Sequence, residues 1–450
     1  FIVILDTSII GVALPAIQAD LGFSASGLSW IFNAYVIAFG GLLLLGGRLS
    51  DLFGARRIFT TGFVILTAAS LLAGLATSQE ILLAGRALQG VGAALIAPSA
   101  LTIVMRLFGH NGAELGKAFG FWGAAAAAGG SAGVFLGGVI TEWMAWQWTF
   151  LINVPLGLIV LTAIPAVLRK SERALGKVDW FGAITVTGAL VSLVYAIVTI
   201  ETAGLGSPLI LSLLGISLAL FVIFLIAQRV RREPLLPLGI FKAPNLAAGN
   251  LVMALLGAAW IPLWFFLNLY LQQVLGLSAL ASGLALLPMT ILIMIVMVGF
   301  SGKLIGRFGP KTNLILGLLL MGASLILFAN LPLDGSFVIN VLPASLLAAL
   351  GMALAYIPAT MSGMAGAKPE ETGLASGLIN TSYQIGSAIG LAVMVVISTA
   401  GYRHGSAGPA EMLQGFQASF QGAGVVAAVA ALATLLLIRG GAAQREVPVG

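Results

Sequence analysis

The chain has no cysteine, two histidines and few charged residues, which make up 8% of its 450 positions. Without cysteine, disulfides, thiolate metal sites and cysteine nucleophiles are excluded. The two histidines, His110 and His404, lie far apart in polar segments and do not suggest a metal site. A soluble domain carries about a quarter charged residues, whereas here 60% of the residues are hydrophobic and the mean hydropathy is +1.09. These proportions indicate an integral membrane protein.

The apolar residues form long, continuous runs rich in Ala, Gly and Leu, which favours helices over a barrel of ten-residue alternating strands. The sequence predicts an all-α integral membrane protein with about 14 transmembrane helices. The expected spans are 1–19, 29–46, 58–77, 81–105, 117–140, 148–168, 180–200, 208–228, 246–273, 280–300, 312–331, 337–361, 373–399 and 418–438. Because Phe1 is not an initiator methionine, we expect that a short N-terminal arm has been lost.

Lys and Arg in the loops predict the orientation, because basic loops stay on the cytoplasmic side. Nineteen of the 21 basic residues fall on one side, which predicts a plasma (inner) membrane protein with both termini in the cytoplasm. The net charge of +6 is then a topology signal, and no nucleic-acid partner is expected. The outer loops carry acidic residues: Asp20, Glu80, Glu142, Glu201, Asp334 and Glu411.

Two parts of the sequence repeat. The loop 47–57 matches 302–312 at both glycines, the Leu, the Phe and the first basic residue, at an offset of 255. Three glycines of the fifth expected span, Gly120, Gly129 and Gly133, match Gly377, Gly386 and Gly390 at an offset of 257. Two parallel halves around a central site are typical of transporters that work by alternating access.

The repeat predicts two pseudo-symmetric six-helix bundles with an inserted two-helix hairpin between them. The expected parts are an N-terminal bundle at 1–168, an inserted pair of spans with basic linkers at 169–243, a C-terminal bundle at 244–438 and a cytoplasmic tail at 439–450.

The chain resembles the major facilitator superfamily, and within it the fourteen-span drug:proton antiporter family. The resemblance covers essentially the whole chain and rests on four stretches: Leu5–Pro15, Gly47–Arg57, Arg86–Ala94 and Gly133–Gly138. The last stretch resembles the antiporter motif but has Val134 where that motif usually has Pro. The resemblance implies a proton-driven exporter of drug-like compounds.

Asp6 and Arg86 are the candidate proton-coupling residues. A carboxylate inside the bilayer is unfavourable unless it is protonated or paired, so Asp6 could bind and release a proton as its access to water alternates. Arg86 could modulate it. The alternatives are a structural hydrogen bond or intramembrane pair for Asp6, and an interface anchor for Arg86.

A conformational latch is expected in the loop 47–57, and a pivot in the fifth span. The candidate residues are Gly47, Asp51, Gly54, Arg56, Arg57, Gly129, Gly133 and Gly137. The alternatives are a tight turn with basic residues that only follow the charge rule, and a glycine groove for close helix packing without motion. In either case we expect Gly47 and Gly54 to provide the turn.

Polar and aromatic residues within the spans are candidates for a substrate cavity, because a mostly apolar site with few polar anchors suits amphipathic molecules. Each could equally be an interhelical hydrogen bond. The candidates are Asn33, Tyr35, Gln89, Trp122, Asn268, Tyr270, Gln272, Asn380 and Gln384.

The sequence therefore predicts a secondary active transporter, not an enzyme, that exports small amphipathic compounds in exchange for protons. It needs no cofactor beyond the proton-motive force, and we expect a monomer whose partners are its substrates, protons and the lipid bilayer. The alternatives are export of an endogenous lipid, siderophore or peptide, uptake of a nutrient, and a non-transporting membrane assembly partner. An intramembrane enzyme is least expected, since Asp6 is the only acidic residue well inside a span.

Overall fold

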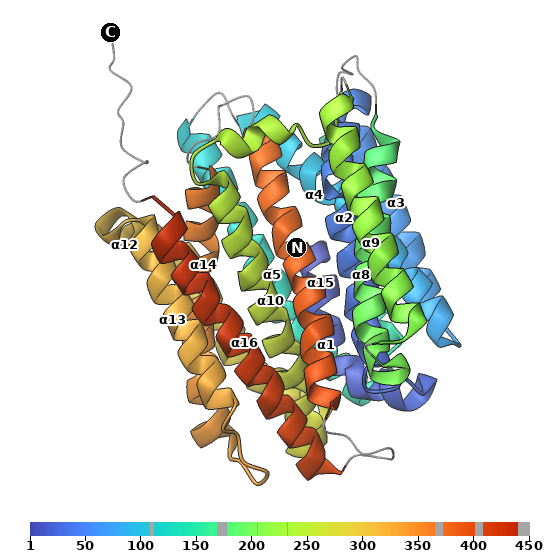
Figure 1. Cartoon of the computed structure of the whole chain (residues 1–450), viewed down its shortest axis with the longest axis vertical. Coiled ribbons are helices and arrows are strands. Elements are labelled where there is room, and N and C mark those ends of the chain that lie inside the picture. The colour runs from blue at the N-terminus through green and yellow to red at the C-terminus, as the bar shows by residue number, and fades with distance from the viewer. Residues whose placement is uncertain are drawn as a thin grey trace.

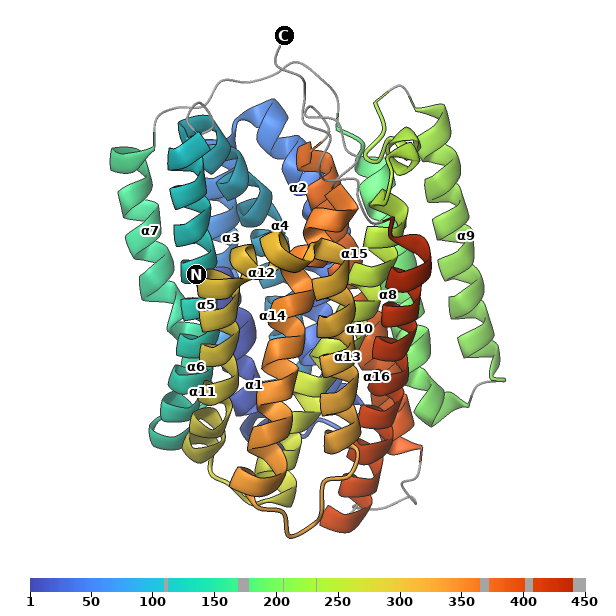
Figure 2. The same cartoon turned by 90° about the vertical axis from the view of Figure 1, so that its left-hand side faces the viewer.

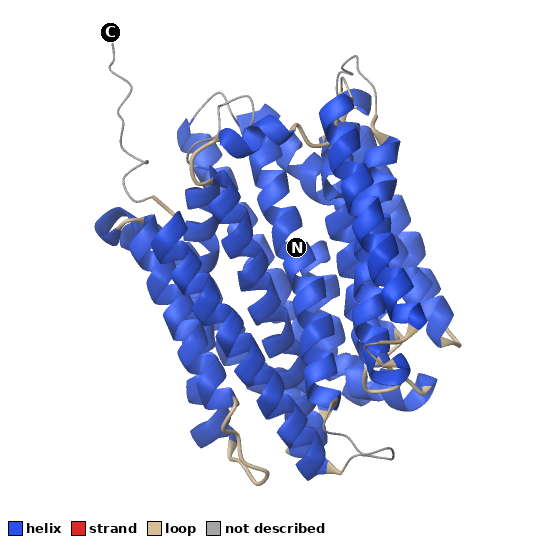
Figure 3. Ribbon diagram, viewed as in Figure 1, coloured by secondary structure: helices blue, strands red, loops and turns tan. Residues whose placement is uncertain are grey.

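The computed structural model describes residues 1–108, 112–168, 178–204, 206–231, 233–364, 372–400 and 408–439. Within these ranges the chain forms helices and no strands, which confirms the all-helical prediction (Figure 3). The long helices run roughly side by side (Figures 1 and 2). The expected basic linker at 169–179, apart from its last two residues, and the tail from residue 440 lie outside the described residues.

The helices have the following bounds in chain order: α1 Ile2–Leu21, α2 Trp30–Phe53, α3 Ala55–Gly74, α4 Gln79–Phe108, α5 Gly112–Trp143, α6 Trp148–Leu151, α7 Asn153–Val167, α8 Trp180–Ala203, α9 Pro208–Val230, α10 Leu246–Leu269, α11 Ala279–Ile295, α12 Ser301–Phe308, α13 Pro310–Phe328, α14 Leu342–Met364, α15 Thr372–Thr399 and α16 Pro409–Leu437. Short 3₁₀ or π-helical turns accompany them at η1 Gly27–Ser29, η2 Leu238–Lys242, η3 Tyr270–Val274, η4 Val296–Phe300 and η5 Phe337–Val341.

Thirteen helical segments of the described chain are long and apolar enough to cross a membrane. The remaining expected span, 117–140, lies within α5, which is 32 residues long. We call the end of the bundle that holds Arg48, Gly54 and Gly309 the basic end. The opposite end, which holds Asp20, Glu142 and Asp334, is the acidic end. In both views the chain begins near mid-height of the bundle (Figures 1 and 2). Asp6, five residues further along in α1, is completely buried.

The two copies of the repeated motif end in the same kind of turn, but they are helices rather than loops. α2 continues through Phe53, and the turn into α3 is the single residue Gly54, with φ of 93°. In the second copy, α12 turns into α13 at Gly309, with φ of 77°. Positive φ at these two places favours glycine. Gly47 lies inside α2, so our expectation that it contributes to the turn was wrong.

Glycine allows α5 to approach α1 very closely. A Cβ atom on Gly133 would lie 2.7 Å from the Cβ of Ser8 and 3.0 Å from the backbone nitrogen of Ile9. Gly129 and Gly137 face α1 in the same way. The second copy repeats this contact, since a Cβ on Gly386 or Gly390 of α15 would overlap Ala254 or Ala258 of α10. The same small-residue packing therefore joins the first and fifth helices of both repeats.

We expect Gly133→Ala and Gly130→Ala to have opposite effects on stability. The new methyl at Gly133 meets α1, so overpacking costs about 1–3 kcal/mol. At Gly130 the nearest atoms of α1 lie 3.9 Å away, so only the better helix propensity remains, worth roughly 0.5–1 kcal/mol. Thermal unfolding in detergent checks this pair, and equal shifts of the two variants would contradict the close α1–α5 contact.

A buried carboxylate at the basic end joins α8 to α9 and to the segment that follows. Asp179 caps α8 by accepting from the backbone N–H of Gly182 at 2.9 Å. It also accepts from Gln228 Nε2 at 2.9 Å, Arg231 Nη1 at 2.8 Å and the backbone N–H of Leu235 at 3.3 Å. We call these five residues the Asp179 cluster.

The Asp179 cluster is next to a contact with α2, where Arg48 Nη2 lies 2.6 Å from Glu233 Oε2. Leu235 packs with Leu45 and Leu49 of α2. Residues 233–235 are therefore attached to α2 at the basic end.

The Asp179 cluster should stabilise the protein at neutral pH and stop doing so in acid. Burial alone raises the pKa of Asp179, but hydrogen bonds from Gln228, Gly182 and Leu235 and the charge of Arg231 hold the pKa below its ordinary value of 3.8. Because the folded-state pKa is the lower one, the stabilisation is complete above 3.8 and is lost as the pH falls through the folded-state value.

We expect Asp179→Asn to lower stability by roughly 1–3 kcal/mol at pH 7, since it leaves buried donors unsatisfied. In thermal unfolding, the difference in midpoint temperature between wild type and Asp179→Asn should become smaller in acid. The matched control is Glu233→Gln, which loses a half-exposed ion pair and should cost about 0–1 kcal/mol. If the difference in midpoint temperature between wild type and Asp179→Asn stays constant down to the lowest accessible pH, Asp179 is not charged in the folded protein.

Candidate functional site

Three helices meet at the carboxylate of Asp6. Arg86 Nη1 of α4 lies 2.8 Å from Asp6 Oδ2, and Gln89 Nε2 of the same helix donates to Asp6 Oδ1 at 2.7 Å. Asn153 Nδ2, on the first residue of α7, donates to Asp6 Oδ1 at 2.6 Å. Asp6 and Arg86 are completely buried. Asp6 thus takes part in a buried ion pair and in hydrogen bonds to two neighbouring helices at the same time.

The guanidinium of Arg86 has further partners that fix its position. Its Nε donates to the backbone oxygen of Ile31 at 2.9 Å, and its Nη1 donates to Gln89 Oε1 at 2.8 Å. The ring of Tyr35 lies 4.5 Å from Arg86 Cζ, within the range of a cation–π contact. Gln89 continues the network by donating to Ser70 Oγ of α3 at 2.8 Å. Since its side chain is fully buried, Arg86 does not reach the membrane surface.

Local sequence explains why α4 can present these side chains to α1. Arg86 and Gln89 are three residues apart, so they lie on one face of the helix. Glycines on either side of that face bring the neighbouring helices close: a Cβ on Gly85 would meet Ala73 of α3 at 2.9 Å. A Cβ on Gly90 would overlap the backbone of Tyr35 in α2.

Some buried polar atoms around the ion pair have no hydrogen-bond partner within the described chain. They are Arg86 Nη2, the Tyr35 hydroxyl and Asn153 Oδ1. An unsatisfied buried polar group costs about 1–3 kcal/mol, so their concentration at one place indicates a site that takes water or a polar ligand. The side-chain amide of Asn33 is also buried without a partner among the described residues, but Asn33 is two residues from Tyr35 along α2 and so lies on the other side of that helix.

The substrate-cavity candidates of the second repeat do not all meet one another. Asn268 of α10 faces α1, where a Cβ on Gly11 would lie 3.0 Å from Asn268 Nδ2. Gln272 donates to the backbone oxygen of Val12 at 2.9 Å, also on α1. Tyr270 instead donates to the backbone oxygen of Pro332 at 2.8 Å, at the acidic end.

The candidates on α15 lie apart from those on α10. Asn380 accepts a hydrogen bond from the Tyr356 hydroxyl of α14 at 3.2 Å, and Gln384 faces Gly40 of α2. Trp122 of α5 is 38% exposed, and no contact described here brings it to the other candidates. The predicted set is thus divided among α2, α5, α10 with η3, and α15, with Gln89 of α4 taken up by the ion pair.

The candidate latch and pivot residues also lie in separate places and make different contacts. Asp51 is exposed, with Arg48 and Arg106 as the positive charges that act on it, while Arg56 and Arg57 open α3. Gly46, rather than Gly47, makes the tight contact, since its Cβ would overlap the backbone of Ala94. Gly129, Gly133 and Gly137 form the α1–α5 contact described above.

Sequence reasoning missed two members of the central network, Ser70 and Asn153. Neither residue is charged, and a single Ser or Asn in a transmembrane run is common enough to pass unnoticed. A signal for Asn153 was available: it stands two residues before Pro155 in an otherwise apolar run. Ser70 has no such signal.

A family comparison fits this fold and site. The model of the Major Facilitator Superfamily matches residues 1–391, and the chain belongs to this family. The cephamycin export protein of Amycolatopsis lactamdurans is 36% identical over 454 residues, which covers 100% of this chain and 92% of that protein. The puromycin resistance protein of Streptomyces alboniger is 37% identical over 402 residues, covering 88% of this chain and 79% of that protein. The predicted family resemblance is confirmed.

Solved transporters share the fold at low sequence identity. A structure of a proton-dependent oligopeptide transporter superposes with a TM-score of 0.66 at 15% identity and covers 97% of this chain and 96% of its own. The human organic anion transporter MFSD10 superposes with a TM-score of 0.62 at 16% identity and covers 96% of this chain and 97% of its own. The fold thus agrees with the family match and the relatives above, which make the chain a multi-pass membrane transporter of this superfamily.

The Asp6–Arg86 pair should show strong energetic coupling. Removing one partner of a buried pair leaves the other charge uncompensated and costs about 3–5 kcal/mol, so Asp6→Asn and Arg86→Gln should each lower stability by that order. The double variant should lose clearly less stability than the two single variants together, because neither charge is left without its partner. Unfolding of the four proteins in detergent measures the coupling.

Ser99→Ala is the control for this cycle, since Ser99 is a buried side chain on the same helix whose hydroxyl donates only to the backbone oxygen of Leu95. When Ser99→Ala is combined with Asp6→Asn, the losses of stability of the two single variants should add up. If the Asp6–Arg86 double variant loses as much stability as the two single variants together, the two charges do not stabilise each other.

Proposed function

We propose that this protein exports small amphipathic, drug-like compounds in exchange for protons, by alternating access between two six-helix bundles. The observation that carries the proposal is the completely buried Asp6–Arg86 pair. Of the described acidic side chains, only Asp6 and Asp179 are buried, and Asp179 caps a helix at the basic end. Asp6 is therefore the carboxylate placed to exchange a proton inside the membrane.

Proton binding changes what the site can hold together. With Asp6 charged, its two oxygens accept from Arg86, Gln89 and Asn153 and so join α1 to α4 and α7. A proton on Asp6 removes the charge that Arg86 neutralises and leaves a buried guanidinium without a counterion. The protonated protein then favours a different arrangement of α1 against α4 and α7, or admits water and substrate to the unsatisfied atoms beside them.

The proton gradient supplies the driving force. A proton that crosses a potential of 100 mV toward the cytoplasm gains about 2.3 kcal/mol, before any contribution from the pH difference. We place the basic end and both termini in the cytoplasm, because basic loops are retained on that side.

The halves, 1–168 and 244–438, move against each other in this proposal, with the inserted pair at 169–243 between them. Hydrogen bonds between the halves support closure at the acidic end in this conformation. Within the described residues these are Gln272 to Val12, Gln273 to Gln18 and the backbone of Leu280 to Glu142.

The substrate class rests on the relatives and on the chemistry of the spans. The relatives are named for the export of cephamycin or for resistance to puromycin and lincomycin, which are small organic compounds. Few polar side chains among many apolar ones suit molecules of this kind. The residues on α1, α2 and α10 around Asn33, Gly11 and Asn268 are the proposed contacts, since they combine unsatisfied polar atoms with the ring of Trp264.

Transport of antibiotics by reconstituted vesicles tests the proposal. Efflux of a panel that includes puromycin, lincomycin and a cephamycin should follow an imposed pH gradient in wild type, and in Asp6→Asn it should fall to the rate of protein-free vesicles. Glu411→Gln, which removes an exposed carboxylate at the start of α16, should transport like wild type.

Two outcomes would contradict parts of this account. Normal coupling in Asp6→Asn would make Asp6 a structural residue. A wild type that moves no compound of the panel would remove the drug assignment and favour an endogenous lipid, siderophore or peptide.

A further inference from the structure

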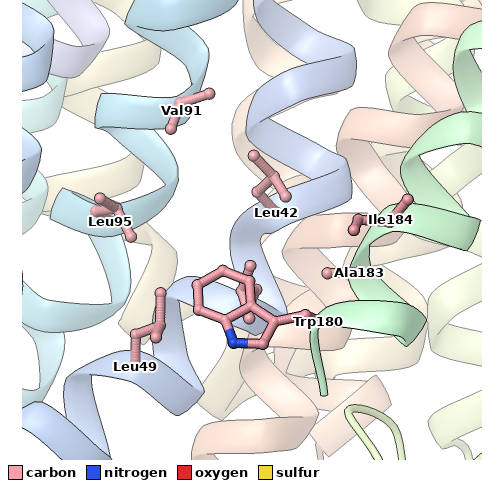
Figure 4. A pocket seen from close by; sticks show the side chains of 8 residues that line it. Leu42, Leu49, Val91, Leu95, Trp180, Ala183 and Ile184 are labelled. Atoms are coloured by element: carbon pink, nitrogen blue, oxygen red, sulfur yellow. The ribbon is translucent and has the colours of Figure 1, made fainter. Parts of the chain in front are cut away.

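An apolar crevice lies between α8 and the α2–α4 surface. Its volume is about 330 Å³, and its walls include Leu42 and Leu49 of α2, Val91 of α4, and Trp180 and Ile184 of α8. Figure 4 shows the Trp180 ring beside Leu49 at one end of the crevice, with Val91 and Leu42 toward the other end. Helices from the first bundle and from the inserted pair therefore build it together.

The crevice is built by contacts on both sides of it. Toward the basic end, the Asp179 cluster fixes the start of α8, directly before Trp180. Eight residues further along α8, Thr187 packs onto Gly41 of α2, where a Cβ would lie 2.7 Å from Thr187 Oγ1. Between these two attachments, α8 stands away from α4 and leaves the space open.

The lining of the crevice suits a hydrocarbon chain. Every lining residue is aliphatic except Trp180, whose indole nitrogen is the only polar side-chain atom among them. Pockets for drug-like molecules combine apolar walls with a few polar groups that orient the ligand, and this crevice has no such group in its depth. One wall is lipid-accessible, since Ile184 is 68% and Trp180 55% exposed on the outer surface of the bundle.

We propose that the crevice binds one acyl chain of a membrane phospholipid from the leaflet at the basic end. Trp180 is the first residue of α8 and so lies at the level where tryptophan prefers the head-group boundary. Arg229 is exposed at the same end, and its charge attracts the lipid phosphate. Arg231, whose charge is balanced by Asp179, lies beside it with its guanidinium 5.0 Å from the ring of Phe181.

The bound chain fills the gap between the inserted pair and the first bundle and so bridges α8 to α2 and α4. This inference does not depend on what the protein transports. It concerns a lipid that stays with the protein, not a transported one.

The test uses the full-length protein in liposomes that contain a phospholipid with a photoreactive diazirine in its acyl chain. Labelling of residues 91–95 and 180–184 should saturate at a low fraction of the probe and be competed by the same lipid without diazirine. Labelling of the lipid-facing side of α9, around Leu218 and Ile226, should rise in proportion to the probe, as expected for bulk lipid.

Variants that fill the crevice provide the decisive comparison. Ala183→Phe should reduce the saturable labelling by roughly tenfold, the change expected when about two methylene groups lose their burial. Val91→Phe enters from the α4 side and should do the same, so it decides the question where Ala183→Phe does not fold. Leu218→Phe, on the exposed face of α9, is the matched control and should leave the labelling unchanged.

Two results would overturn the proposal. One is labelling of the crevice that does not saturate in wild type, which would mean bulk lipid only. The other is competition of the labelling by a transported antibiotic rather than by phospholipid, which would make the crevice part of a drug-binding site.

Discussion

A carboxylate inside a membrane protein needs a positive partner, a set of hydrogen-bond donors or a proton, because the hydrocarbon supplies none of them. Asp6 has the first two, since Arg86, Gln89 and Asn153 all donate to it within 2.8 Å. These donors come from helices that are far apart in sequence, so the charge of one side chain determines how α1, α4 and α7 pack. In the proposed function, a change in that charge changes how these helices pack.

Glycine makes this arrangement possible. The hydrophobic effect does not drive helices together in lipid, so close packing must come from small residues that let backbones touch. Gly85 and Gly90 of α4 bring α3 and α2 up to Arg86, and Gly129, Gly133 and Gly137 of α5 bring a smooth surface up to α1 behind Asp6. The helix that carries the carboxylate thus lies between a polar network and a glycine surface.

The sequence was sufficient for the helical fold, the family and the two charged residues, because each depends on a strong local signal. Long apolar runs predict the spans, and Asp6 and Arg86 stand out as charges within them. The Asp179 cluster could not be predicted, since its residues come from two helix ends and a connecting segment that meet only in three dimensions. The turn was assigned to both Gly47 and Gly54, whereas the backbone uses only Gly54, and a glycine pattern cannot distinguish a turn from a packing contact.

The central claim is that Asp6 exchanges its contact with Arg86 for a proton during transport. Infrared difference spectroscopy on the reconstituted protein, as the pH or the substrate is changed, tests it directly. The account predicts a carbonyl band of a protonated carboxyl group that appears in wild type, shifts in heavy water and is absent from Asp6→Asn. A carboxylate of Asp6 that stays ionised under every condition in which the protein transports would contradict it.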